Sequence, residues 1–350
     1  MLSFSFGRTC SAVLAELCEE IFQGVPVLHG KSNYTTWGRH CYARLNKYGL
    51  MEFIKGELSP PSERPHEKES EPFFEDRVKL LTATSKQAFA FRLILLSCQL
   101  DIQVKYTELE TAKLLWETLR AEYSPLLEPQ DGPASSCAFR AWKHFIDLKY
   151  SGEPIEQFCN EYRDAVWLCE EAELKLEPKV QSLQFVALLE SSFPEWCQAK
   201  QSHIPTTENP DQIPELESLV EDIVREEDLS RTFPNFRPEP QDEPASSNVN
   251  FGAWKYFIDL KYRGEPVEEF CDTYRDAVWL CEVADLKLEP KVQSLQFVAL
   301  LESRFPEWGQ AKQSLMPTPG KPDQIPELES LIEDIVREDL SRTIPYSPGS

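Results

Sequence analysis

Apolar residues recur at helical spacing through the middle of the chain. After Pro154 they stand three or four positions apart, at Ile155, Phe158, Tyr162, Val166 and Cys169. Residues at these intervals lie on one face of an α-helix. A proline can begin a helix without penalty, because its missing N–H and fixed φ suit the first turn. The pattern therefore predicts a helix that starts beside Pro154 and buries one face.

Three further segments around this helix have the same periodicity. They are the stripe from Phe139 to Lys149, the segment that Pro178 opens, and the segment 214–229. The second is expected to stop near Phe193, because the residue before a proline disfavours the α region. The last has apolar residues on one side and acids on the other. The four segments together predict a small all-α unit.

The chain then repeats this unit. Phe139 matches Phe251 and Pro194 matches Pro306, both 112 positions apart, and the duplicated stretch spans about 128–232 and 239–343. A repeat of this length suits a small domain better than one turn of a solenoid. The expected organisation is an N-terminal segment 1–26 with a short amphipathic helix, an N-terminal lobe 27–127, a first C-terminal lobe 128–232, a Pro-rich linker 233–250 and a second C-terminal lobe 251–345.

The N-terminal lobe reads as helical too. One helix is expected from Thr35 or Thr36, as its cap, to a stop at Gly49. A Pro-rich, charged loop over 57–72 and a helical segment over 73–100 follow. A final helix is expected within 107–123, with Thr107 or Thr111 near its start and an apolar face that includes Trp116 and Leu119.

Charge and cysteine usage narrow the function classes. The formal net charge is −23, from 36 basic and 59 acidic residues, and no cluster of Lys and Arg stands out. Phosphate backbones are bound by such clusters, so nucleic-acid binding is not predicted.

No apolar run approaches the roughly 18–20 residues that span a bilayer. Glu16, Glu19 and Glu20 interrupt the apolar core that a secretory signal needs. Ten cysteines without a C-x-x-C pair predict buried free thiols. We expect a cytoplasmic protein without membrane contact, and nuclear access stays open.

Three stretches resemble the Gag polypeptide of copia-type retrotransposons. The first is a Leu-x-Gly-x-Asn-Tyr-x-x-Trp pattern with a Leu-rich helix, carried by Leu28, Gly30, Asn33, Tyr34, Trp37, Leu45 and Leu50. The second is a helix pattern carried by Thr111, Ala112, Trp116, Leu119 and Tyr123. The third runs from "FIDLKYSGEPIEQF" to "LLESSFPEW". They follow one another in the family's order between Val27 and about Glu227.

The resemblance implies an all-α, retroviral-capsid-like protein with an N-terminal and a C-terminal lobe, the latter doubled here. Its implied activity is self-association into a capsid-type assembly, with itself and other Gag-like chains as partners. The chain lacks the zinc knuckle, basic tail, protease motif and polymerase motif of such polyproteins. These departures suggest a truncated or host-retained derivative, which leaves a second possibility: a host adaptor that binds other proteins through its lobes.

No motif for catalysis stands out. Of the five histidines, His144 and His203 lie in the first repeat, where the second has Tyr256 and Leu315. The sequence has no G-x-S-x-G, H-E-x-x-H, Walker loop or G-x-G-x-x-G. We therefore expect no catalytic residues, no cofactor and no metal site.

Four tryptophans are candidate association residues. Trp167 and Trp279 sit about 140° around the helix from the main apolar face, and Trp196 and Trp308 follow the Phe-Pro breaks. Each belongs either to a second layer of the core or to an interface, where Trp is enriched. Two arrangements of the copies are open: they pair within one chain, or they join one chain to two neighbours.

Overall fold

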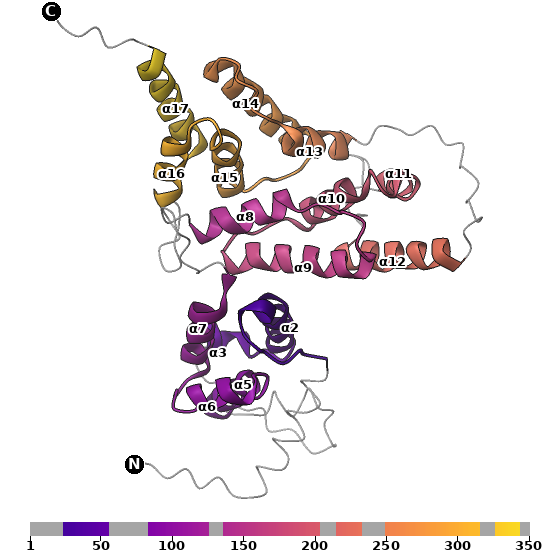
Figure 1. The fold of residues 1–350 in the computed structure, drawn as a ribbon, viewed down its shortest axis with the longest axis vertical. Helices are drawn as coiled ribbons and strands as arrows, with labels where there is room; N and C mark the ends of the chain where they lie inside the picture. The colour runs from indigo at the N-terminus through magenta and orange to yellow at the C-terminus, as the bar shows by residue number, and fades with distance from the viewer. Residues whose placement is uncertain are drawn as a thin grey trace, which may run out of the picture. The chain divides into compact units, whose positions relative to one another are not determined.

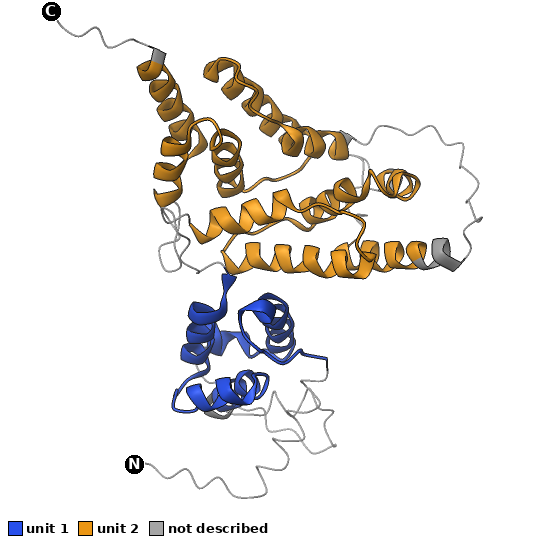
Figure 2. Ribbon diagram, in the orientation of Figure 1, with its two compact units in different colours: residues 1–128 blue, residues 129–350 orange. Residues whose placement is uncertain are grey.

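The protein is helical throughout the part of the chain that its structure describes. This structure is a computed structural model that describes residues 24–55, 83–125, 136–203, 215–232, 249–315 and 326–343. Within these ranges there are 15 α-helices, one short 3-10 helix and a single isolated parallel bridge between Leu28 and Cys98. The all-α fold class is confirmed. The chain divides into two compact units, residues 1–128 and 129–350 (Figures 1 and 2).

The N-terminal unit is built around two tryptophans. Its elements are η1 (Lys31–Asn33), α2 (Tyr34–Lys47), α3 (Met51–Lys55), α5 (Ala83–Leu96), α6 (Leu100–Tyr106) and α7 (Ala112–Tyr123). Trp37 of α2 stacks on Trp116 of α7, with ring centroids 5.6 Å apart. Its indole Nε1 donates a hydrogen bond of 2.9 Å to the buried Ser97 Oγ. α2, α7 and the residue that follows α5 thus meet at one aromatic pair.

The ends of these helices test three expectations. α2 begins at Tyr34, so Thr35 and Thr36 lie inside its first turn and do not cap it. Gly49, at φ 64°, follows its end as predicted. α7 starts after Thr111, whose side chain accepts a hydrogen bond of 3.1 Å from Leu114 N, which settles the choice between the two threonines.

The predicted helical segment 73–100 is interrupted. α5 ends at Leu96 and α6 starts at Leu100, because the backbone between them bonds elsewhere. Leu28 N donates to Ser97 O at 2.8 Å, and Gln99 N donates to Leu28 O at 2.9 Å. Residues 73–82, the expected loop 57–72 and the expected helix within 1–23 lie outside the described residues.

The C-terminal unit holds both repeat copies, each with five helices. Copy 1 has α8 (Cys137–Asp147), α9 (Ile155–Glu171), α10 (Pro178–Leu189), α11 (Pro194–His203) and α12 (Leu216–Thr232). Copy 2 has α13 (Val249–Asp259), α14 (Val267–Val283), α15 (Pro290–Leu301), α16 (Pro306–Leu315) and α17 (Leu328–Thr343). The sequence pattern missed α11 and α16. Each begins at the proline that was taken only as a stop, because a proline can occupy the first position of a new helix.

Each copy has its own aromatic core, and the predicted buried face of α9 belongs to it. Phe158 of α9 stacks on Phe185 of α10 at 6.1 Å, and Tyr162 lies 5.1 Å from the same ring. The Tyr162 hydroxyl donates to Gln181 O at 2.5 Å, which satisfies a polar atom in this core. Copy 2 repeats these contacts with the corresponding residues.

The cysteines of the described part are free and buried. Eight of them fall in this part, and they are Cys41, Cys98, Cys137, Cys159, Cys169, Cys197, Cys271 and Cys281. Burial raises the pKa of Cys98 to about 12 and that of Cys271 to about 11, so these thiols stay protonated at neutral pH. The prediction of buried free thiols is confirmed for these eight. Cys10 and Cys18 lie outside the described residues.

Candidate association interface

The two copies pack against each other in a reciprocal way. α8 of copy 1 contacts α15 of copy 2, and the equivalent helix α13 of copy 2 contacts α10 of copy 1 (Figure 1). Each of these helices also packs on the next helix of its own copy, α8 on α9 and α13 on α14. We call the contact of α8 and α10 with α13 and α15 the copy–copy interface. The pattern identifies it as the place where the duplicated unit meets itself.

A buried polar pair occurs twice at this interface. Trp142 Nε1 donates to Gln296 Oε1 at 3.0 Å, and Trp254 Nε1 donates to Gln184 Oε1 at 3.1 Å. Both indoles are fully buried, and both glutamines are 1% exposed. A buried indole N–H needs an acceptor. Each copy therefore supplies the acceptor for the tryptophan of the other.

Ion pairs and loop contacts surround the buried pair with the same reciprocity. Lys143 Nζ lies 2.7 Å from Glu302 Oε2, and Lys255 pairs with Glu190 in the equivalent place. Surface ion pairs of this kind contribute little each, about 0–1 kcal/mol. Their value here is that they fix the register in which the two copies meet.

The turns after α9 and α14 also touch across the interface. Lys175 N donates to Glu289 Oε2 at 3.3 Å, and Lys287 N donates to Glu177 Oε2 at 3.2 Å. One contact breaks the symmetry: the buried Lys179 donates to Asp285 O at 3.2 Å. These contacts place the two turns side by side.

The reciprocity has a simple meaning. When residue i contacts j and the equivalent of j contacts the equivalent of i, the interface is isologous, as in a two-fold symmetric dimer. Here both partners belong to one chain. Of the two arrangements that the sequence left open, the structure has the pairing of the copies within the chain.

The residues that make this interface were missed in the sequence. Gln184 and Gln296 stand between a leucine and a phenylalanine in the middle of α10 and α15, "PKVQSLQFVALL" in both copies. A glutamine at such a position needs a buried partner. That was the available signal, and it pointed away from the four tryptophans chosen as candidates.

The four candidate tryptophans have different surroundings. Trp196 and Trp308 are 8% and 6% exposed, with their rings at the edges of Phe185 and Phe297. They therefore belong to the core of their own copies. Trp167 is 5% exposed, whereas Trp279, in the same sequence context, is 58% exposed. The hydrogen bonds and ion pairs of the copy–copy interface given above do not involve these four residues.

Within the described part of the chain no three His, Cys, Asp or Glu side chains gather as they would around a metal ion. Among the same residues, no helix has both the length and the apolar character needed to cross a membrane. Comparison with protein-family models, with curated proteins and with solved structures gives no match to this chain.

The ion pair of Lys143 with Glu302 leads to a pH-dependent prediction. Burial acts to raise the pKa of Glu302, but hydrogen bonds from Lys143 and Gln313 outweigh it, and the pKa lies below its ordinary value of 4.5. A carboxyl with a lowered folded-state pKa stabilises the fold above its unfolded pKa and loses that contribution as pH falls through the folded value. Glu302→Gln should thus lower the free energy of unfolding by about 0.5–1 kcal/mol at pH 7.

The difference between the two proteins should shrink as pH falls below 4.5. Urea unfolding at a series of pH values measures it. Glu333→Gln, an exposed change in the middle of α17, is the matched control and should leave stability unchanged at pH 7. A Glu302→Gln effect of equal size at acid and neutral pH would contradict the ion-pair origin.

Proposed function

We propose that this protein is a non-enzymatic adaptor or scaffold, whose C-terminal unit is a closed pair of Gag-like helical lobes. The observation that carries the proposal is the reciprocal packing of the two copies, with each buried tryptophan bonded to the other copy. The self-association that the resemblance to Gag implies would then be met inside one chain at this interface. What remains for the chain is to present its other surfaces to partner proteins.

Linkage of the two copies supports this view. A second lobe on the same chain is present at a high effective concentration, which short linkers bring to the millimolar range. A lobe of another chain cannot compete at ordinary protein concentrations. The pairing therefore caps assembly through this interface.

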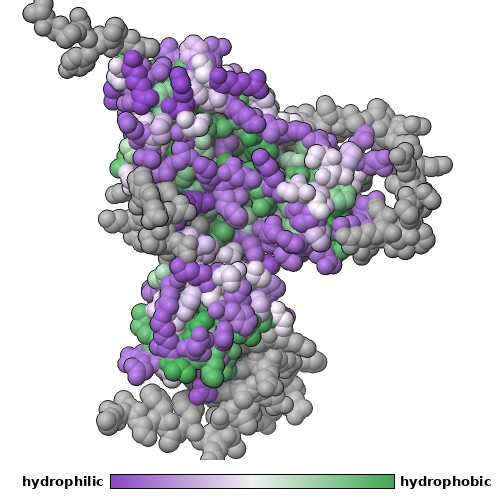
Figure 3. Space-filling model, viewed as in Figure 1, coloured by the Kyte–Doolittle hydropathy of each residue, from purple (hydrophilic) through white to green (hydrophobic). Residues whose placement is uncertain are grey.

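A second candidate function is capsid-type assembly, and one observation favours it. Leu96, Leu100 and Val104, at the junction of α5 and α6, are 52%, 72% and 69% exposed. Figure 3 shows hydrophobic surface on the N-terminal unit. Contiguous exposed apolar surface marks association sites. In this alternative the chain is a truncated or host-retained retrotransposon derivative that assembles through its N-terminal unit, with other Gag-like chains as partners.

Both candidates share their remaining assignments. We propose a cytoplasmic protein that uses neither cofactor nor metal and that acts on other proteins rather than on nucleic acid or membranes. The net charge of −23 supports the exclusion of nucleic acid, since phosphate binding needs clustered cations.

Sedimentation velocity and negative-stain microscopy separate the two candidates. The adaptor proposal expects a monomer over a wide concentration range and no particles. Regular particles that disappear in Leu100→Asp would overturn it in favour of assembly. Ser192→Arg, an exposed change in copy 1 to the residue that copy 2 has, serves as the control and should behave as the unaltered chain.

Cleavage tests the closed pair itself. A protease site inserted within 233–248, the sequence that joins the copies, allows the full chain to be cut once. We expect the two halves to stay together in gel filtration, because the copy–copy interface holds them. Separation under native conditions would refute the closed pair.

A further inference from the structure

A hollow on copy 2 lies between the two helices that begin that copy. It has a volume of about 540 Å³ and is lined by α13, the loop after it and α14. The two helices run antiparallel, because Cys281 lies against Ala253 while Tyr274 lies against Phe257. We call this hollow and the exposed apolar residues beside it on α14 the α13–α14 groove.

The two copies differ most where this hollow is. Half of the residues that line it differ from their counterparts in copy 1, whereas about a fifth of all positions differ between 137–203 and 249–315. The changes from copy 1 to copy 2 are Arg140 to Gly252, His144 to Tyr256, Ser151 to Arg263, Gln157 to Glu269 and Glu161 to Thr273. A Cβ at Gly252 would meet no atom within 4 Å, so the missing side chain leaves open space. The differences therefore open and reshape one face of copy 2.

The same face is apolar and exposed. On α14, Leu280 is 37% and Val283 52% exposed, and Tyr256 of α13 is 43% exposed. In copy 1 the equivalent of Leu280, Leu168, is 5% exposed. The leucine on this helix face is thus buried in one copy and exposed in the other.

Two of the sequence changes on this face replace a polar or charged residue with an apolar or aromatic one. Val283 stands where copy 1 has Glu171, and Tyr256 stands where it has His144. A surface that only faced water would gain nothing from these residues, since exposed apolar patches are a liability. The direction of change favours a bound partner.

Charges at the groove indicate which partner. Asp276 lies one helical turn before Leu280 on α14, and it is exposed. Asp259 and Glu269 line the hollow and are exposed as well. The α14 side of the groove is therefore acidic.

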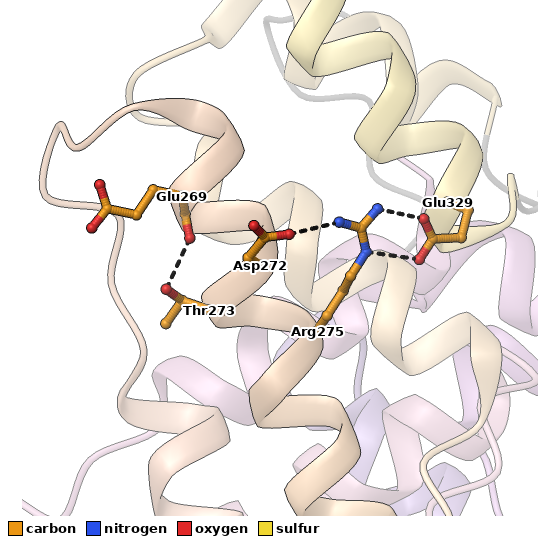
Figure 4. Close-up of polar contacts among 5 residues, drawn as sticks. All are labelled: Glu269, Asp272, Thr273, Arg275 and Glu329. Carbon is orange, nitrogen blue, oxygen red and sulfur yellow. Dashed lines mark hydrogen bonds and ion pairs between the residues drawn. The ribbon is translucent and has the colours of Figure 1, made fainter.

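The nearby cations are largely engaged. Arg275 is held between Asp272 of α14 and Glu329 of α17, on the opposite side of α14 from Glu269 and Thr273 (Figure 4). Lys255 is paired with Glu190 of copy 1. Lys261 and Arg263 remain, and both belong to the loop at one end of the hollow.

We propose that the α13–α14 groove binds an amphipathic helix of another protein, one with an apolar face flanked by Lys and Arg. A groove between two helices accepts a third by ridge-into-groove packing, and an apolar face with complementary charges gives it affinity and orientation. A second copy of this chain fits less well, because its acidic α14 would meet the same acids. The inference rests on the adaptor function and gives it a binding surface.

Isothermal titration of the full chain with two synthetic helical peptides tests the proposal. The peptides have the same length and the same apolar positions, and one carries Lys where the other carries Glu. We expect the Lys peptide to bind with one-to-one stoichiometry, more weakly as salt rises, and the Glu peptide not to bind.

Copy 1 offers a matched variant that should still fold. Gly252→Arg, Tyr256→His and Val283→Glu together give copy 2 the residues that copy 1 has at these places. These three substitutions should lower the affinity for the Lys peptide by at least about tenfold, as loss of interface anchors does. Circular dichroism checks the fold, and Ser192→Arg, far from the groove in sequence, should bind as the unaltered chain.

Several outcomes would overturn the proposal. These are equal binding of both peptides, binding of neither, and Lys-peptide binding that the triple variant leaves unchanged. A concentration-dependent dimer that the triple variant abolishes would assign the groove to a second copy instead. The closed pair is tested separately by the cleavage experiment, in which the two halves of the chain either stay together or come apart. A failure of the groove and a failure of the closed pair are therefore distinguishable.

Discussion

Trp254→Ala is expected to lower the free energy of unfolding of the C-terminal unit by about 3–5 kcal/mol, the usual range for a buried tryptophan. The indole is fully buried, its ring lies 5.8 Å from Phe257, and its N–H bonds to Gln184 of copy 1. Truncation removes apolar contacts in copy 2 and leaves a glutamine of copy 1 without its donor. Urea unfolding followed by circular dichroism measures the change.

Trp279→Ala is the matched control, because it removes the same side chain from the same copy at an exposed position. With 58% of that residue exposed, we expect a change within about 0.5 kcal/mol. Gel filtration of the cleaved chain is a second measurement. In the Trp254→Ala variant the two halves should separate, and in the Trp279→Ala variant they should stay together. Equal effects of the two substitutions would mean that the copies do not depend on the buried pair.

Periodicity was enough to predict the helices that bury one face. The stripe from Ile155 to Cys169 gave α9 nearly to its ends, and the repeat gave α14 with it. The periodicity of apolar residues failed as a predictor where one residue has two structural roles. Pro194 both ends the turn after α10 and begins α11, and nothing in the local pattern distinguishes these roles from a plain stop.

Burial of the candidate tryptophans could not be predicted for a different reason. Trp167 and Trp279 stand in the same local sequence, "YRDAVWLCE", yet one is buried and the other exposed. Identical local sequence cannot encode different surroundings, which depend on the rest of the fold. The bond from Trp142 to Gln296 could not be predicted from periodicity either, because periodicity shows that a face is apolar but does not identify what covers it.

The buried pair allows a double-mutant cycle, whose first member is Gln184→Leu. This change is expected to cost about 1–3 kcal/mol, because the Trp254 N–H stays buried without an acceptor. Trp254→Phe removes the donor and so leaves the glutamine unpaired. The double variant removes both polar groups and should be more stable than the sum of the single effects predicts, by about 1 kcal/mol.

Reciprocity supplies the strongest control for this cycle. Gln296→Leu should cost as much as Gln184→Leu, since Trp142 donates to Gln296 in the equivalent geometry, at 3.0 Å against 3.1 Å. Gln198→Leu, an exposed change on α11, should leave stability within about 0.5 kcal/mol. Chemical denaturation of the six proteins measures the cycle and its controls. Strict additivity, or a large cost on one side of the interface alone, would show that the two copies are not held by a symmetric pair. In that case the duplication would have produced two neighbouring lobes rather than an internal dimer.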